Sequence, residues 1–166
     1  LAWIMDRVMP ALAEDGFRLL VAGAVTRSLT GRREPWLVAR PEMPDLSPLL
    51  HAADAGLNPV TTGGGSNVKL PTYLAAGLAV VTTPFGLRGY ASLRPHVEVA
   101  TLEEMTEALR ERPAGWRARG LRLPDAVGEF AWGTLGEKLG EALEACREAP
   151  RRGTMRNQEV AGRTGA

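Results

Sequence analysis

A glycine-rich loop followed directly by helix-forming residues is the part of this sequence best suited to chemistry. Consecutive glycines let a ligand approach the backbone closely, and the start of a helix presents N–H groups with a partial positive charge. The pattern therefore predicts a site for a phosphate-bearing ligand; its alternative is a flexible turn that binds nothing. The residues of the predicted site are Gly63, Gly64, Gly65, Ser66, Asn67 and Lys69.

The elements that must position this loop alternate between strands and helices. Apolar runs predict strands at Phe17–Ala22, Trp36–Ala39, Ala55–Val60, Leu78–Thr82 and Val97–Ala100. Helical spacing predicts helices at Leu46–Ala53, at Asn67–Ala76, after a capping box formed by Thr101 and Glu104, and around Leu135, Leu139 and Leu143. This alternation indicates an α/β fold with a mostly parallel sheet and helices on both faces. We expect the strands at Phe17–Ala22, Ala55–Val60 and Leu78–Thr82 to belong to one sheet.

The first residues predict a helix rather than a strand. Ile4, Val8 and Leu12 share one helical face, and Pro10 is a site for a kink. In doubly wound folds the first strand is central, and its loop usually touches the ligand. We therefore expect the first strand to be missing and the 166 residues to be a piece of a longer protein.

Composition excludes several classes of protein. The 20 Lys and Arg nearly balance the 19 Asp and Glu, so a formal charge of +1 gives no field that favours nucleic acid. One cysteine excludes an internal disulfide, and no apolar run is long enough to predict a membrane span. We expect a cytoplasmic location, with membrane association left open. We predict one domain over residues 1–149 and a disordered basic tail over residues 150–166.

Several short motifs together resemble the carboxyl-terminal, donor-binding domain of GT-B glycosyltransferases, in particular the retaining enzymes of family 4. The resemblance covers about residues 1–143 and depends on the order and spacing of the motifs. They are Asp45-Leu46-Ser47-Pro48-Leu49-Leu50, Leu57-Asn58-Pro59, the loop from Gly63 to Lys69, Tyr73-Leu74-Ala75-Ala76-Gly77, Val80-Val81-Thr82-Thr83-Pro84-Phe85-Gly86 and Phe130-Ala131-Trp132. The resemblance implies a Rossmann-like domain that is one half of a GT-B fold.

The resemblance also implies roles for individual residues. The glycine loop would bind the diphosphate of a nucleotide sugar, with Lys69 either as an added positive charge or as a solvated lysine. Thr72 takes the place of a glutamate that binds the ribose, and Gly64 the place of a second glutamate. The segment Pro41, Glu42 and Met43 would frame the nucleobase; its alternative is a proline-stiffened connector. Pro71 predicts a helix that is either shortened or strained.

Two functions therefore remain open. The first is a donor domain that binds a nucleotide-diphosphate sugar for transfer of the sugar to an acceptor hydroxyl, with no cofactor and no metal, because the sequence has no Asp-x-Asp pair. Its partner would be an acceptor-binding domain that this chain lacks, so the chain alone should show little turnover. The second is a non-catalytic module that binds nucleotide weakly or only pairs with another chain. The catalytic residues, the sugar and the nucleobase are not specified by the sequence.

Overall fold

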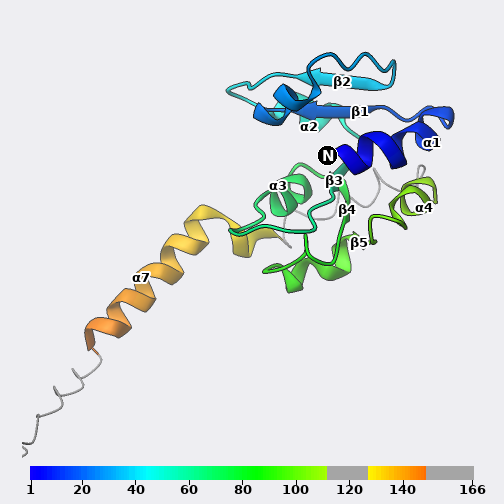
Figure 1. The fold of residues 1–166 in the computed structure, drawn as a ribbon. Helices are drawn as coiled ribbons and strands as arrows, with labels where there is room; N and C mark the ends of the chain where they lie inside the picture. Colours follow the sequence, from blue (N-terminus) through cyan, green and yellow to red (C-terminus); the bar gives the residue numbers. More distant parts are fainter. Residues whose placement is uncertain (112–126, 149–166) are drawn as a thin grey trace, which may run out of the picture. The chain divides into compact units, whose positions relative to one another are not determined.

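The computed structural model (Figure 1) describes residues 1–111 and 127–148. The chain divides into two compact units, and the boundary in the sequence falls between Ala131 and Trp132. The strands are β1 (Leu19–Ala22), β2 (Leu37–Arg40), β3 (Ala55–Asn58), β4 (Ala79–Thr82) and β5 (Glu98–Val99). The helices of the first unit are η1 (Ile4–Val8), α1 (Met9–Glu14), η2 (Ala24–Leu29), α2 (Ser47–Ala52), α3 (Lys69–Ala75), η3 (Ala91–His96), α4 (Met105–Arg110) and η4 (Gly128–Phe130). The described part of the second unit contains α7 (Trp132–Glu148), which is the closing helix predicted around Leu135, Leu139 and Leu143. The expected tail over residues 150–166 lies outside the described residues.

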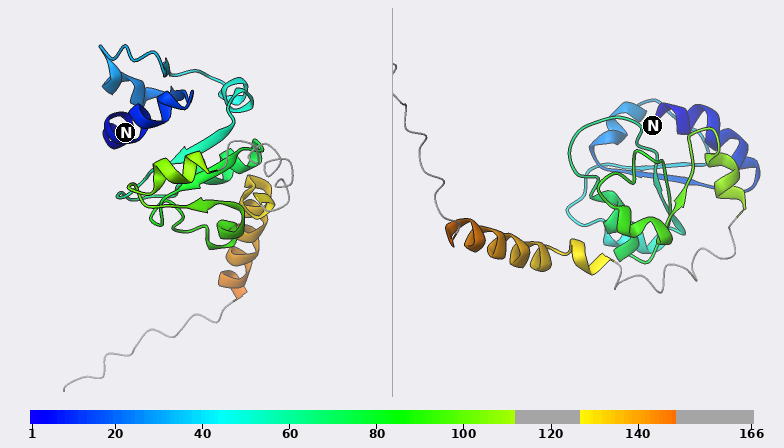
Figure 2. Two further views of the ribbon diagram at one scale, coloured as in Figure 1. Left: turned by 90° about the vertical axis from the view of Figure 1, so that its right-hand side faces the viewer. Right: turned by 90° about the horizontal axis from the view of Figure 1, so that it is seen from below.

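Every strand pairing in the described residues is parallel, which confirms the predicted α/β class. The expectation of one sheet for the three strands is wrong in one respect, because the hydrogen bonds form two sheets. One sheet has the order β1-β2 and the other has the order β3-β4-β5 (Figure 2). The physical reason is that β1 and β3 do not pair with each other, so each keeps one unpaired edge. Four of the five strands are one to two residues shorter than predicted, whereas β2 keeps the predicted length and is shifted by one residue.

Helices cover both faces of the sheet that contains β4. The side chains of β4 alternate between two hydrophobic clusters, as a strand's period of two requires. Ala79 and Val81 pack in a cluster with η1, α1 and α4, whereas Val80 packs in a cluster with α3 and η3. All four residues of β4 are buried, which is typical of a central strand in a parallel sheet.

The opening helix changes type just ahead of Pro10, where the sequence offers a site for a kink. Residues Ile4–Val8 form a π-helix, and Pro10 lies at the start of the α-helix that follows. Proline has no N–H group to donate to the preceding turn, so a widened turn ahead of it is the expected local response. The apolar face still packs: Ile4, Val8 and Leu12 are almost completely buried.

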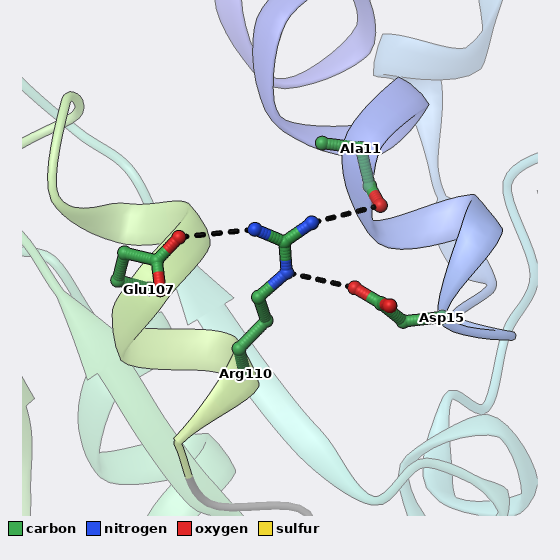
Figure 3. A network of polar contacts seen from close by, with 4 residues as sticks. All are labelled: Ala11, Asp15, Glu107 and Arg110. Carbon is green, nitrogen blue, oxygen red and sulfur yellow. Dashed lines mark hydrogen bonds and ion pairs between the residues drawn. The ribbon is translucent and has the colours of Figure 1, made fainter.

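Polar contacts join the opening helical segment, formed by η1 and α1, to α4 at both ends. The Trp3 Nε1 donates to the carbonyl of Leu102 at 3.3 Å, near the start of each helical segment. Near their ends, the Arg110 guanidinium contacts an Asp15 carboxylate oxygen at 2.7 Å and the carbonyl of Ala11 at 3.3 Å (Figure 3). The two helical segments therefore lie side by side and run in the same direction.

The predicted capping box ahead of α4 is confirmed by two reciprocal hydrogen bonds. Thr101 N–H donates to the Glu104 carboxylate at 2.9 Å, and Glu104 N–H donates to the Thr101 hydroxyl at 3.3 Å. The bond from the Thr101 N–H holds the pKa of the Glu104 carboxyl below its ordinary value.

Candidate functional site

The candidate site lies where two loops leave the neighbouring strands β3 and β4. Asn58 and Thr82, the last residues of these strands, are register partners, so the following loops start at the same edge of the sheet. In open parallel sheets this edge is the usual place for ligands. The first loop carries the three glycines, and the second contains Phe85, Gly86 and Arg88.

Side chains of each loop bond to the backbone of the other. Asn67 Nδ2 donates to the carbonyl of Gly86 at 2.8 Å. In the opposite direction, Arg88 Nη2 donates to the carbonyls of Gly63 at 3.2 Å and Gly65 at 3.4 Å. The Arg88 guanidinium also lies 4.5 Å from the ring centroid of Phe85. The two loops therefore form one connected structure, which fixes the shape of the glycine loop from outside it.

Two of the three glycines in the first loop have backbone angles that favour glycine, and the third does not. Gly63 and Gly65 have φ angles of 127° and 84°, which side-chain-bearing residues rarely adopt. Gly64 has no such requirement, and a Cβ atom built on it meets no atom within 4 Å. A side chain at position 64 would therefore project into open space, which leaves the loop surface accessible to a ligand.

The N–H groups of the glycine loop are available to a ligand. Within the described residues, no hydrogen bond uses the backbone N–H of residues 63–67 as a donor. Because Gly63, Gly64, Gly65 and Ser66 are exposed, water satisfies these groups in the absence of a ligand. An anion could replace that water with charge-assisted hydrogen bonds.

Helix α3 begins later than the sequence predicts. It starts at Lys69 instead of Asn67, so Pro71 lies in its first turn, where a missing N–H costs little. Leu70 N–H donates to the Asn67 carbonyl at 3.1 Å and so occupies the acceptor that a longer helix would have offered to residue 71. Of the two alternatives set by Pro71, the structure therefore has the shortened helix. With seven residues, α3 supplies only a small helix dipole, and the positive charge at the site comes mainly from side chains.

A small pocket of about 170 Å³ lies between the loops. It is smaller than the roughly 300–1,000 Å³ of a pocket for a complete drug-sized ligand. Two cationic side chains, Lys69 and Arg88, line it, and no carboxylate does. Size and charge both suit one anionic group of a larger ligand. The lining consists of Val60, Thr62, Gly63, Gly64, Gly65, Ser66, Asn67, Lys69, Phe85 and Arg88.

The structure brings all six residues of the predicted phosphate site to this pocket, but not the residues predicted for ribose and nucleobase. The Thr72 hydroxyl donates to the Val68 carbonyl at 2.7 Å within α3, and Thr72 does not line the pocket. Pro41, Glu42 and Met43 follow β2 in the other sheet, where the Glu42 carboxylate lies 3.7 Å from Arg27. These segments are therefore separate from the pocket in this structure.

Sequence reasoning missed Arg88. This residue lies 25 positions after Gly63, and nothing in its local sequence sets it apart from other surface arginines. The signal that could have found it is topological, because Arg88 is the first basic residue after the end of the strand neighbouring β3.

In residues 1–111 and 127–148, no group of three or more His, Cys, Asp or Glu is placed to hold a metal ion. No helix in the same residues is long and apolar enough to cross a membrane.

Comparison with protein families defines the class of this chain. Residues 1–111 match the family described as Glycosyl transferases group 1, and this match covers more than half of the chain. The chain therefore belongs to the group 1 glycosyltransferases and contains a GT-B type glycosyltransferase domain, which confirms the resemblance to GT-B glycosyltransferases. A search of curated proteins found none that matches the chain.

Proposed function

We propose that the pocket between the two loops binds the diphosphate of a nucleotide-sugar donor, as in the retaining enzymes of family 4. The observation that carries the proposal is the pairing of unbonded loop N–H groups with the cations Lys69 and Arg88 around one small pocket. Anions are held by such combinations of backbone donors and positive side chains. A pocket of about 170 Å³ would hold the diphosphate and leave the sugar and nucleoside outside it.

The same groups would act during glycosyl transfer. When the bond between the sugar's anomeric carbon and the diphosphate oxygen breaks, negative charge grows on the diphosphate. Lys69, Arg88 and the loop N–H groups would stabilise that charge without a metal, because they are positioned before the reaction. The oxygen of the acceptor hydroxyl would bond to the anomeric carbon, and its proton would pass to the departing diphosphate. In this proposal a separate acceptor-binding domain positions that hydroxyl.

Ribose and nucleobase would be held less firmly. Thr72 is the proposed ribose contact, yet its hydroxyl hydrogen is donated to Val68 and only its acceptor capacity remains. Pro41, Glu42 and Met43 are the proposed nucleobase segment, and they would have to approach the ligand from the end of β2. These observations favour a second candidate function, a non-catalytic module that binds nucleotide weakly.

Calorimetric titration with UDP and with GDP tests the proposal. We expect the parent chain to bind at least one of them, and Gly64→Val to lower its affinity at least tenfold by covering the loop N–H groups. Gly128→Val is the matched control, since Gly128 also has open space at its Cβ position and no positive φ, and it lies outside the pocket. Equal affinity for all three chains would mean that the loop is only a turn. No binding of either nucleotide by the parent would support the non-catalytic module.

A further inference from the structure

Buried polar side chains are concentrated where the two pocket loops leave the sheet. In the part of the chain that the structure describes, the buried polar side chains belong to Asn58, Thr82 and Thr83. Asn58 ends β3, Thr82 ends β4, and Thr83 is the first residue of the second loop. A polar group held away from water costs free energy unless it is hydrogen-bonded, so its hydrogen bonds indicate what the group holds in place.

The Thr83 hydroxyl bonds to both pocket loops. It donates to the carbonyl of Val60 in the first loop and accepts the N–H of Gly86 in the second loop at 2.9 Å. A hydroxyl has one donor and two acceptor sites, which is what such a bridge requires. The Thr83 N–H also donates to the carbonyl of Asn58 at 3.3 Å, which holds Thr83 against the end of β3. One buried oxygen therefore links the two loops close to the sheet.

The hydroxyl of the neighbouring Thr82 makes a different set of contacts. It accepts a hydrogen bond from Asn58 Nδ2 at 2.9 Å, and its own hydrogen is shared between the carbonyls of Asn58 at 3.4 Å and Thr83 at 3.3 Å. None of these partners lies beyond Thr83 in either loop. The two threonines are adjacent and almost equally buried, at 0% and 2% exposure, but only the Thr83 hydroxyl bonds directly to the backbone of both loops.

The bridge through Thr83 joins segments that line the pocket. Val60 lines the pocket itself, and Gly86 lies in the chain between the lining residues Phe85 and Arg88. A shift of Gly86 relative to Val60 would therefore carry Arg88 away from the glycine loop. Displacement of a group by about 1 Å can cost about 100-fold in rate where a site depends on orientation.

The contacts between the outer parts of the loops are less able to fix this spacing. Arg88 is exposed where it donates to the carbonyls of Gly63 and Gly65, and Asn67 is half-buried where it donates to the carbonyl of Gly86. Water competes for hydrogen bonds at such positions, whereas a buried hydrogen bond is strengthened by its low-dielectric surroundings. The buried Thr83 hydroxyl is therefore the stronger constraint, and the outer contacts depend on it.

We propose that Thr83 is a positioning residue for the pocket, whose hydroxyl sets the spacing between the glycine loop and Arg88. This role rests on the proposed diphosphate site. Thr83 does not line the pocket, so it acts through Val60 and Gly86 and not by contact with the ligand. A diphosphate that contacts both loops needs the spacing, whereas a single phosphate can bind to one loop alone. Loss of the hydroxyl should therefore weaken the binding of UDP more than that of UMP.

Calorimetric titration with UDP and with UMP tests this role in matched variants. Thr83→Val removes the hydroxyl and keeps the shape of the side chain, and we expect UDP affinity to fall about tenfold and UMP affinity less than about threefold. Thr83→Ser keeps the hydroxyl and should restore UDP affinity to within about twofold of the parent. Thr82→Val removes the neighbouring buried hydroxyl and should leave the ratio of the two affinities unchanged. If Thr83→Val is too unstable to titrate, Thr83→Cys, a weaker donor and acceptor, should show the same selective loss to a smaller degree.

Hydrogen exchange measured by NMR gives a second readout that needs no ligand. The Asn67 side-chain amide donates to the Gly86 carbonyl, whereas Thr83 bonds to the Gly86 N–H. If Thr83 positions Gly86, the Asn67 amide hydrogens should exchange about threefold faster or more in Thr83→Val than in the parent. They should exchange at the parent's rate in Thr83→Ser and in Thr82→Val. A role limited to overall stability would instead speed exchange equally in the two valine variants.

Three titration results would overturn the proposal. They are an unchanged ratio of UDP to UMP affinity in Thr83→Val, an equal fall of that ratio in Thr82→Val, and a failure of Thr83→Ser to restore UDP binding. A parent chain that binds neither nucleotide would overturn the proposed function instead. In that event the exchange of the Asn67 amide decides the positioning role, and an unchanged rate in Thr83→Val would overturn it.

Discussion

Asn67 Nδ2 donates a 2.8 Å hydrogen bond to the carbonyl of Gly86, and this bond joins the loop that follows β3 to the loop that follows β4. Asn67 is half-buried, so its amide competes little with water for this acceptor. The bond holds Asn67, which lies two residues before the start of α3, beside the second loop. The position of the glycine loop therefore depends on a residue 19 positions away in the chain.

Asn67→Ala should loosen the two loops. Loss of one such hydrogen bond typically lowers the free energy of unfolding by about 0.5–1.5 kcal/mol. Urea denaturation followed by circular dichroism measures this change. Ser92→Ala is a control that also removes one side-chain hydrogen bond, that from Ser92 in η3 to Glu129, but leaves the pocket intact. If only Asn67→Ala weakens UDP binding, the bond positions the loop; equal effects on binding would contradict that role.

Gly86→Ala should destabilise the chain by close contact at the crossing of the loops. A Cβ atom at position 86 would lie 2.5 Å from Thr82 Oγ1 and 2.7 Å from Asn58 Nδ2, and both of these side chains are completely buried. Overpacking of this kind costs about 1–3 kcal/mol of unfolding free energy. Gly64→Ala adds the same methyl group in open space and should change stability by less than about 0.5 kcal/mol. Equal stability of the two variants would show that the loops can move apart without cost.

The capping box predicts how stability depends on pH. The folded-state pKa of Glu104 is lowered, chiefly by the N–H of Thr101, so its contribution to stability is complete above the unfolded pKa. It is lost as the pH falls through the folded pKa. The pKa values of Glu34, beside Arg32, and of Asp45, beside Ser47, are lowered as well and add to the same acid loss.

Glu104→Gln isolates the part that comes from the capping box. We expect the variant to be less stable than the parent near about pH 7 and equal to it well below the folded pKa, where the parent's own carboxyl is neutral. Urea midpoints at about pH 7 and about pH 2 measure this difference. A difference that is the same at both pH values would mean that the Glu104 charge has no role in the cap.

Thr72→Glu should strengthen nucleoside binding if the ribose lies over α3. A carboxylate can accept hydrogen bonds from both ribose hydroxyls, whereas the threonine hydroxyl is already donated to Val68. The expected gain is about tenfold in the affinity for UDP and close to none for inorganic diphosphate, as measured by calorimetry. Thr72→Gln controls for size. A gain that is equal for both ligands, or no gain at all, would place the ribose elsewhere.

Local patterns in the sequence predicted local structure well. The Thr101 and Glu104 spacing specified a capping box, and the unbroken apolar runs specified parallel strands, because both depend on residues close together in the chain. The glycine loop and Lys69 were identified as lining one site for the same reason. Pro71 was compatible with two alternative starts of the helix, and only the structure shows which of them occurs.

Long-range features could not be predicted in this way. Arg88 reaches the glycine loop only because β3 and β4 are paired in a specific register, and its own neighbours in the sequence carry no sign of that contact. The division into two sheets depends on which strands pair with each other. An apolar run in the sequence indicates a buried strand but not the strand with which it pairs. Thr72 lies outside the pocket and its hydroxyl is bonded to the Val68 carbonyl within α3, which the spacing of motifs along the chain does not indicate.

A diphosphate bound by Arg88 and the glycine loop should be distinguished from a single phosphate, and binding of UDP is therefore compared with binding of UMP. We expect Arg88→Gln to lower the affinity for UDP at least tenfold and the affinity for UMP much less, because the lost charge faces the second phosphate. Arg94→Gln is the matched control, since Arg94 is also exposed but lies outside the pocket, and it should leave both affinities unchanged. Equal losses of UDP and UMP affinity in Arg88→Gln, or UDP affinity that is the same in Arg88→Gln and the parent, would contradict a diphosphate site at this loop.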